Sequence, residues 1–78
     1  MITSYLLITT ESVDPLLVAQ ELTYIEEVEN VHQTTGEYEL IARVIAENLI
    51  ELRENVLPKA EKIKGIEKIT TLIVEDQE

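Results

Sequence analysis

Aliphatic and β-branched residues recur along four extended segments of the chain, and this pattern predicts β-strands. The predicted strands cover Ser4–Thr10, Val28–Thr35, Tyr38–Ala46 and Ile66–Glu75. Two segments between them carry apolar residues at helical spacing, which is typical of a helix with one buried face. The pattern therefore predicts the element order βαββαβ, followed by a frayed tail over Asp76–Glu78.

Local residues set the expected limits of the first helix and of the turn between the middle strands. Asp14 can cap the first helix, whose first turn suits Pro15, and this helix is expected to end near Glu27. Gly36 can adopt a positive φ, so it is expected to make the turn of a hairpin between the second and third strands.

Particular residues also predict the start, an interruption and the end of the second helix. Asn48 can cap it, with Glu51 at the capping-box position three residues later. Pro58 lacks an amide donor, so a kink or division is expected near Leu57. Gly65 is expected to end the helix as its C′ residue.

This element order is that of a ferredoxin-like α+β fold with an antiparallel four-stranded sheet. Right-handed crossovers place both helices on one face and give the strand order 4-1-3-2. A length of 78 residues fits a single domain over residues 1–78. The chain has no cysteine, so disulfides cannot supplement its small core, and association of subunits is expected to add buried surface.

Both faces of the predicted sheet are apolar, and the helices can cover only one. One face carries Leu6, Ile8, Leu40, Ala42, Val44, Ile69, Thr71 and Ile73, and the other carries Tyr5, Leu7, Ile41, Ile45, Thr70, Leu72 and Val74. A large apolar side chain gains about 1.5–3 kcal/mol on full burial, and an extended apolar patch usually marks an interface. The pattern therefore predicts a sheet-to-sheet homodimer, a dimeric α/β sandwich. The alternative is a monomer whose second face is partly shielded by charged neighbours such as Arg43.

Sixteen acidic residues against six basic residues give a net charge of −10. This charge opposes binding to the phosphates of nucleic acids and to anionic membrane surfaces. Because the sequence also has no long apolar run and no basic leader, a cytoplasmic protein is expected.

The residues that usually carry catalysis or hold a metal are few. There is no cysteine, and His32 is the one histidine. Neither Ser4 nor Ser12 lies in a nucleophile elbow, and two glycines cannot form a glycine-rich phosphate loop. The sequence therefore predicts no enzyme, no metal site and no cofactor.

The segment Val31–Ile41 contains the run Thr-Thr-Gly-Glu-Tyr-Glu-Leu within the predicted hairpin. In order and spacing it resembles the C-terminal effector-binding (RAM) domain of the Lrp/AsnC transcription regulators. The exit from the second helix at Gly65-Ile66 and the later Thr70-Thr71 pair are similar too, so the resemblance covers essentially the whole chain. Met1 leads almost directly into the first strand, and a stand-alone form without the helix-turn-helix domain is expected.

The resemblance implies sheet-to-sheet dimers that assemble further into a ring-like oligomer, with amino-acid effectors bound between dimers near the hairpin. It assigns ligand contacts to Thr35, Gly36, Glu37, Glu39, Thr70 and Thr71. The carboxylates can accept hydrogen bonds from a ligand ammonium, while threonine hydroxyls and the amides around Gly36 can donate to its carboxylate. The family usually carries Asp at the position of Glu39. The extra methylene of Glu39 moves the carboxylate by about 1.5 Å relative to an Asp.

Three functions follow from these features. The leading hypothesis is a non-enzymatic module that binds an amino acid and modulates full-length Lrp/AsnC regulators without binding DNA itself. The second is a purely structural oligomer or adaptor. The third is a small dimeric ferredoxin-like enzyme, which would need an ionisable pocket on the second sheet face, where Tyr5 and Arg43 are the exceptions among aliphatic residues.

Overall fold

The computed structural model describes residues 1–75, and its elements follow the predicted βαββαβ order. The strands are β1 (Ile2–Thr10), β2 (Val28–Gln33), β3 (Leu40–Ala46) and β4 (Ile66–Ile73), and the helical segments are α1 (Pro15–Leu22), α2 (Leu49–Glu51), the π-helical η1 (Leu52–Val56) and α3 (Leu57–Glu61). The strands form an antiparallel sheet in the order β2-β3-β1-β4, which confirms the prediction. The expected tail over Asp76–Glu78 lies outside the described residues.

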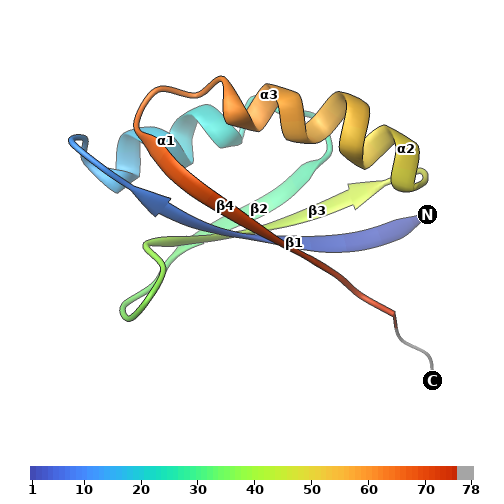
Figure 1. Ribbon diagram of the computed structural model, residues 1–78, viewed down its shortest axis with the longest axis horizontal. Helices are drawn as coiled ribbons and strands as arrows, with labels where there is room; N and C mark the ends of the chain where they lie inside the picture. Colours follow the sequence, from blue (N-terminus) through green and yellow to red (C-terminus); the bar gives the residue numbers. More distant parts are fainter. Residues whose placement is uncertain (76–78) are drawn as a thin grey trace.

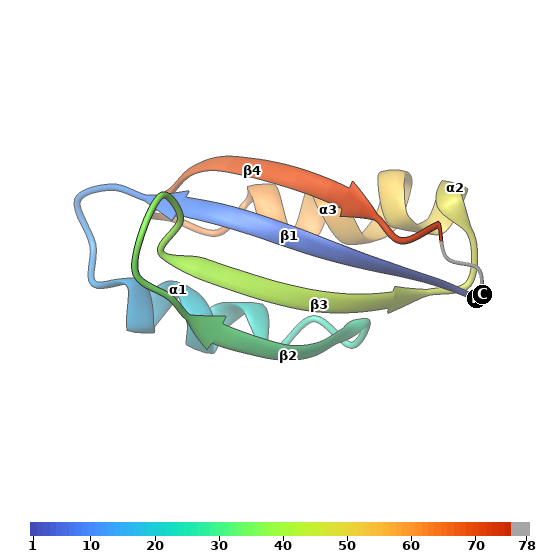
Figure 2. The same ribbon diagram turned by 90° about the horizontal axis from the view of Figure 1, so that it is seen from below.

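The molecule has two layers (Figure 1). The helical segments lie on one side of the twisted sheet, with α1 and α3 side by side. Figure 2 shows the other side, where the strands face the viewer and no helix of residues 1–75 lies in front of them. The predicted ferredoxin-like fold is confirmed. Within residues 1–75, no helix is both long and apolar enough to cross a membrane.

The core lies between the helices and the face of the sheet that they cover. Every second side chain is buried along β3 and along the middle of β1, from Ser4 to Ile8, as a period of two requires. The buried apolar side chains are Leu6, Ile8, Val18, Leu22, Ile25, Val28, Leu40, Ala42, Val44, Ala46, Leu52, Val56 and Ala60. Ser4 is buried among them, and its hydroxyl donates to the carbonyl of Leu72 at 2.9 Å, so this polar group is satisfied.

The first helix begins as predicted and ends earlier. The carboxylate of Asp14 accepts from the amide of Leu16 at 2.9 Å and caps α1. The helix ends at Leu22 and not near Glu27, because the hydroxyl of Thr23 donates to the carbonyl of Gln20 at 2.6 Å. Such local side-chain bonds compete with helical hydrogen bonding.

The capping box of the second helical segment is confirmed, with one variation. The amide of Glu51 donates to Oδ1 of Asn48 at 2.8 Å. The carboxylate of Glu51 reaches back to the amide of Glu47 at 2.7 Å, one residue before the cap. Two amides at the start of the helix are therefore satisfied by side chains.

The break expected near Leu57 appears as a change of helical geometry. Residues 49–61 are helical throughout, but η1 makes wide turns in which the amide of Leu57 donates to the carbonyl of Leu52. Because Pro58 has no amide hydrogen, the preceding turn cannot keep a regular α-helical pattern.

Gly65 was expected to follow the helix directly, and this prediction is wrong. Helix α3 ends at Glu61, and Gly65 lies later in the turn that leads to β4, with φ +101°. Its carbonyl accepts from the amide of Glu11 at 2.9 Å, and a Cβ at this position would come within 2.3 Å of the side chain of Val13. Gly65 thus lets the turn pack closely against the loop before α1.

Candidate functional site

Residues 34–39 form a closed loop between β2 and β3. The hydroxyl of Thr34 donates to the carbonyl of Tyr38 at 2.6 Å, and its amide donates to the carbonyl of Glu39 at 3.0 Å. Strand β2 ends at Gln33 and β3 starts at Leu40, and the two bonds of Thr34 close the loop between them. The loop is therefore longer than the predicted turn, and it projects to the side of the sheet opposite the helices (Figure 1).

The tip of this loop is accessible. Thr35, Gly36 and Glu37 are all exposed, and Gly36 has the expected positive φ of +123°. Nothing lies within 4 Å of the position that a Cβ on Gly36 would occupy. Among residues 1–75, Glu37 has no hydrogen-bond or ion-pair partner. The tip therefore presents a solvated carboxylate beside a backbone that a ligand can approach closely.

Glu39 is half-buried and holds the loop against the end of β1. Its Oε1 accepts from the amide of Thr10 at 2.9 Å, and its own amide donates to the carbonyl of Ile8 at 3.0 Å. A carboxylate has a second oxygen that can still accept from a ligand while Oε1 holds Thr10. Glu39 thus has a structural contact that the sequence did not reveal.

Glu39→Ala is expected to lower the free energy of unfolding by roughly 1 kcal/mol, because the amide of Thr10 loses a charged acceptor. Glu39→Gln keeps an acceptor oxygen and is expected to cost about half as much. Urea unfolding at one fixed protein concentration measures both. Equal stability of Glu39→Ala and the parent protein would show that this bond contributes nothing.

The two candidate threonines of β4 lie on opposite faces of the sheet. Thr70 pairs with Leu7 and shares its face, whereas Thr71 pairs with Leu6 and points toward the helices. Strand β1 lies between β4 and β3, and Leu7 also pairs with Ile41 of β3. Thr70 therefore lies about two strand spacings, roughly 10 Å, from the start of β3. The structure therefore brings Thr70, but not Thr71, to the face beyond which the loop projects.

The sheet face opposite the helices, here called the open face, carries Tyr5, Leu7, Ile41, Arg43, Ile45, Thr70, Leu72 and Val74. Leu72 is 49% exposed and Val74 41% exposed. Arg43 does not spread over these residues, because its guanidinium pairs with Glu29. Figure 2 looks onto this face and shows no other element of residues 1–75 in front of it.

Metal-binding side chains do not gather in residues 1–75. No group of three or more His, Cys, Asp and Glu side chains there could hold a metal ion. His32 is exposed on β2 and pairs in register with Ile41.

Sequence reasoning missed two residues of this region, Thr34 and Thr10. Thr34 stands directly before the turn residue pair Thr35-Gly36, and a threonine that begins a loop often bonds to nearby backbone, so its role could have been inferred. The contact between Thr10 and Glu39 joins residues 29 positions apart, and no local pattern predicts it.

Known proteins share both the family and the fold of this chain. The family model of the Lrp/AsnC ligand binding domain matches residues 3–77. No curated protein matches the chain. Among solved structures, TTHA0845 from Thermus thermophilus is 26% identical, with a TM-score of 0.91 over 100% of this chain and 98% of that one.

Two further structures are longer proteins. Escherichia coli AsnC is 25% identical, with a TM-score of 0.88 over 97% of this chain and 52% of that one. The feast or famine regulatory protein Rv3291c from M. tuberculosis, complexed with L-methionine, is 20% identical, with a TM-score of 0.78 over 99% of this chain and 52% of that one. The latter likeness concerns the fold alone. With the family match spanning nearly all of its residues, the chain belongs to the family of Lrp/AsnC ligand binding domains.

Proposed function

We propose that this chain is a sensing and oligomerisation module that binds an amino acid at the β2–β3 loop and pairs with a second copy through its open face. The observation that carries the proposal is the loop itself. It projects beyond the open face and presents Glu37, with the backbone of Gly36 bare beside it. A related fold in the M. tuberculosis regulator is complexed with L-methionine, which supports an amino acid as ligand class.

The proposed contacts divide the two charged ends of the ligand. Glu37 and the second oxygen of Glu39 accept from its ammonium, while the amides near Gly36 and the hydroxyls of Thr35 and Thr70 donate to its carboxylate. Thr71 faces the helices and is left out of this set. Within one chain, Thr70 lies about 10 Å from the start of β3. In this proposal a second copy, paired across the open face, completes the site.

In this proposal the module acts in the cytoplasm. It does not bind DNA itself, because a net charge of −10 repels phosphates. It works through protein contacts, as a homodimer that assembles further into a ring and co-assembles with full-length Lrp/AsnC regulators. The shared fold of E. coli AsnC, at 25% identity, supports that pairing.

Calorimetric titration with each common amino acid tests the sensing function. At least one is expected to bind, and Glu37→Gln is expected to weaken its binding about tenfold, because Gln keeps an acceptor oxygen but lacks the negative charge that strengthens a hydrogen bond from the ammonium. Glu37 is the clean probe, since Glu39 also holds Thr10. Glu61→Gln, an equal charge change on α3, is the matched control and should leave binding unchanged. Failure of every amino acid to bind would remove the sensing function.

One observation favours the second candidate, a purely structural oligomer. An acceptor proposed for the ligand, the carboxylate of Glu39, already uses its Oε1 in a bond within the chain. A structural module would keep the same pairing through the open face but bind no amino acid, so the same titration separates the two functions.

A further inference from the structure

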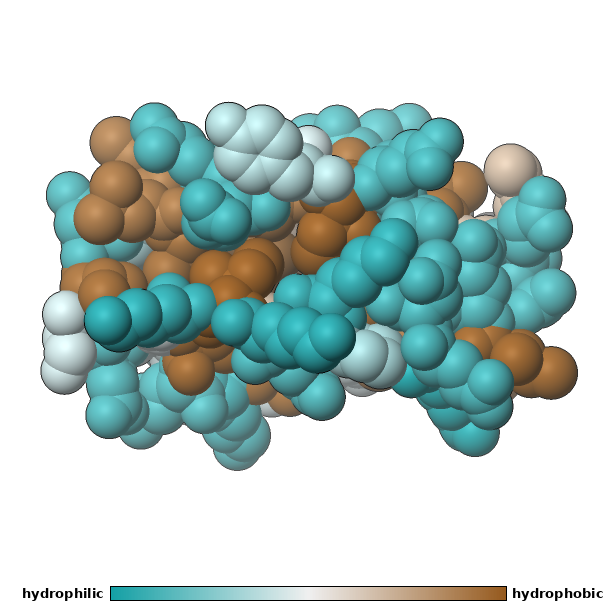
Figure 3. All heavy atoms as spheres, turned by 90° about the horizontal axis from the view of Figure 1, so that it is seen from above, coloured by the Kyte–Doolittle hydropathy of each residue, from teal (hydrophilic) through white to brown (hydrophobic). Residues whose placement is uncertain are grey.

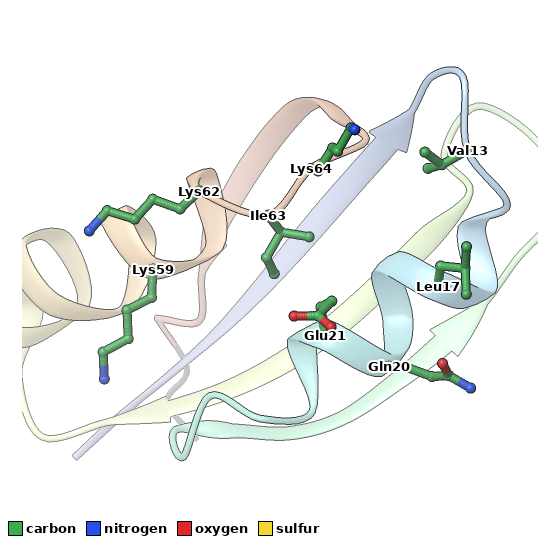
Figure 4. A pocket seen from close by; sticks show the side chains of 8 residues that line it. All are labelled: Val13, Leu17, Gln20, Glu21, Lys59, Lys62, Ile63 and Lys64. Carbon is green, nitrogen blue, oxygen red and sulfur yellow. The ribbon is translucent and has the colours of Figure 1, made fainter.

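A groove of about 560 Å³ lies on the helix-bearing side of the molecule, between α1 and the end of α3 (Figure 4). Leu17, Gln20 and Glu21 line it from α1. The opposite rim is formed by Lys59 and by residues 62–64, which follow α3. This groove is remote from the β2–β3 loop, which projects from the other side of the sheet.

The groove contains a row of apolar side chains. Val13, Leu17 and Ile63 lie along it, and Leu17 is 56% exposed. Figure 3 views this side and shows apolar atoms in the valley between polar helix surfaces. The loops at its end are joined by the hydrogen bond from the amide of Glu11 to the carbonyl of Gly65, so its apolar wall is held in place.

The charge of the groove is opposite to that of the chain as a whole. Lys59, Lys62 and Lys64, half of the six basic residues in a chain of net charge −10, line it together with one acidic residue, Glu21. Lys59 lies 4.0 Å from Glu27, whereas Lys62 and Lys64 have no ion-pair partner within residues 1–75. Two of the three ammonium groups are therefore available to an anionic partner.

We propose that this groove docks an acidic amphipathic segment of a partner protein. Aliphatic side chains of the segment would pack on Val13, Leu17 and Ile63, while its carboxylates would meet the lysine rim. The groove lies between two helices and is open toward solvent, which suits a segment laid along it better than an enclosed small molecule. Pairing through the open face would leave it exposed, so both contacts can form at once.

Fluorescence anisotropy with a labelled synthetic helical peptide of Leu and Glu, leucines at i, i+3, i+4 and i+7, tests this proposal. The parent protein is expected to bind it, and the double variant Lys62→Glu/Lys64→Glu to bind at least about tenfold more weakly. Leu17→Ser removes an exposed apolar contact and is expected to weaken binding about fivefold. Circular dichroism verifies that each variant is folded.

The matched control is Arg53→Glu/Lys68→Glu, which changes the net charge equally at exposed positions outside the groove lining. It is expected to bind within about twofold of the parent. Three outcomes would overturn the proposal: no binding by the parent, equal losses in both double variants, or equal binding of a Leu and Lys peptide. Displacement of the peptide by a short DNA duplex at lower concentration than by unlabelled peptide would instead identify a nucleic-acid site.

Discussion

Gly65→Ala is expected to lower the free energy of unfolding by about 3 kcal/mol. Two costs add at this position. An L-residue is strained at φ +101°, and the new Cβ would lie 2.3 Å from Cγ2 of Val13, far inside normal contact distance. Urea unfolding at one fixed protein concentration measures the loss, since stability of an oligomer depends on concentration.

Gly36→Ala is the matched control for this result. Gly36 also has a positive φ, +123°, but nothing lies within 4 Å of its added Cβ. It should lose only the backbone component, about 1–2 kcal/mol. In the double variant Val13→Ala/Gly65→Ala the two changes should couple favourably by about 1 kcal/mol. Equal losses for both glycine variants would mean that the packing of Gly65 against Val13 has no energetic weight.

Ile41→Glu is expected to convert the native particle to a monomer of 8.9 kDa. Ile41 lies on the open face beside Leu7, and pairing with a second copy would bury the new carboxylate among aliphatic side chains. An unpaired buried charge costs several kcal/mol, and this cost opposes pairing through the open face. Sedimentation equilibrium measures the mass.

Ile50→Glu makes the same substitution on α2, where Ile50 is 67% exposed. Its native mass should equal that of the parent protein. Circular dichroism should show both variants folded, because Ile41 lies outside the buried core. An Ile41→Glu variant that keeps the parent's mass would place any interface elsewhere.

The fold could be predicted from the sequence because each of its determinants is local or periodic. Runs of aliphatic and β-branched residues predicted β1 and β3, and the caps Asp14 and Asn48 predicted the starts of both helices. Handedness then limited the strand order to the one observed. The ends of elements were less predictable, since the hydroxyls of Thr23 and Thr34, next to the ends of α1 and β2, form hydrogen bonds to backbone carbonyls of the adjoining helix and loop.

The candidate site could be predicted only in part, because it depends on contacts between distant residues. The exposed tip with Gly36 and Glu37 follows from local turn preferences. The opposite orientations of Thr70 and Thr71 follow from the period of two along any strand, but which of them faces the helices depends on how β4 pairs with β1. The bond from Thr10 to Glu39 also depends on strand pairing, which the chain fixes only on folding. The groove between α1 and α3 likewise joins residues 13–21 to residues 59–64, and no motif links them.

Pairing through the open face underlies the proposed function, since it would cover Leu72 and Val74 and bring two loops together. Light scattering of the native protein over a range of concentrations tests it most directly. The expected mass is at least twice the 8.9 kDa of the chain, in an even number of copies, and stable on dilution to low micromolar concentration. A mass of 8.9 kDa at every concentration would contradict it.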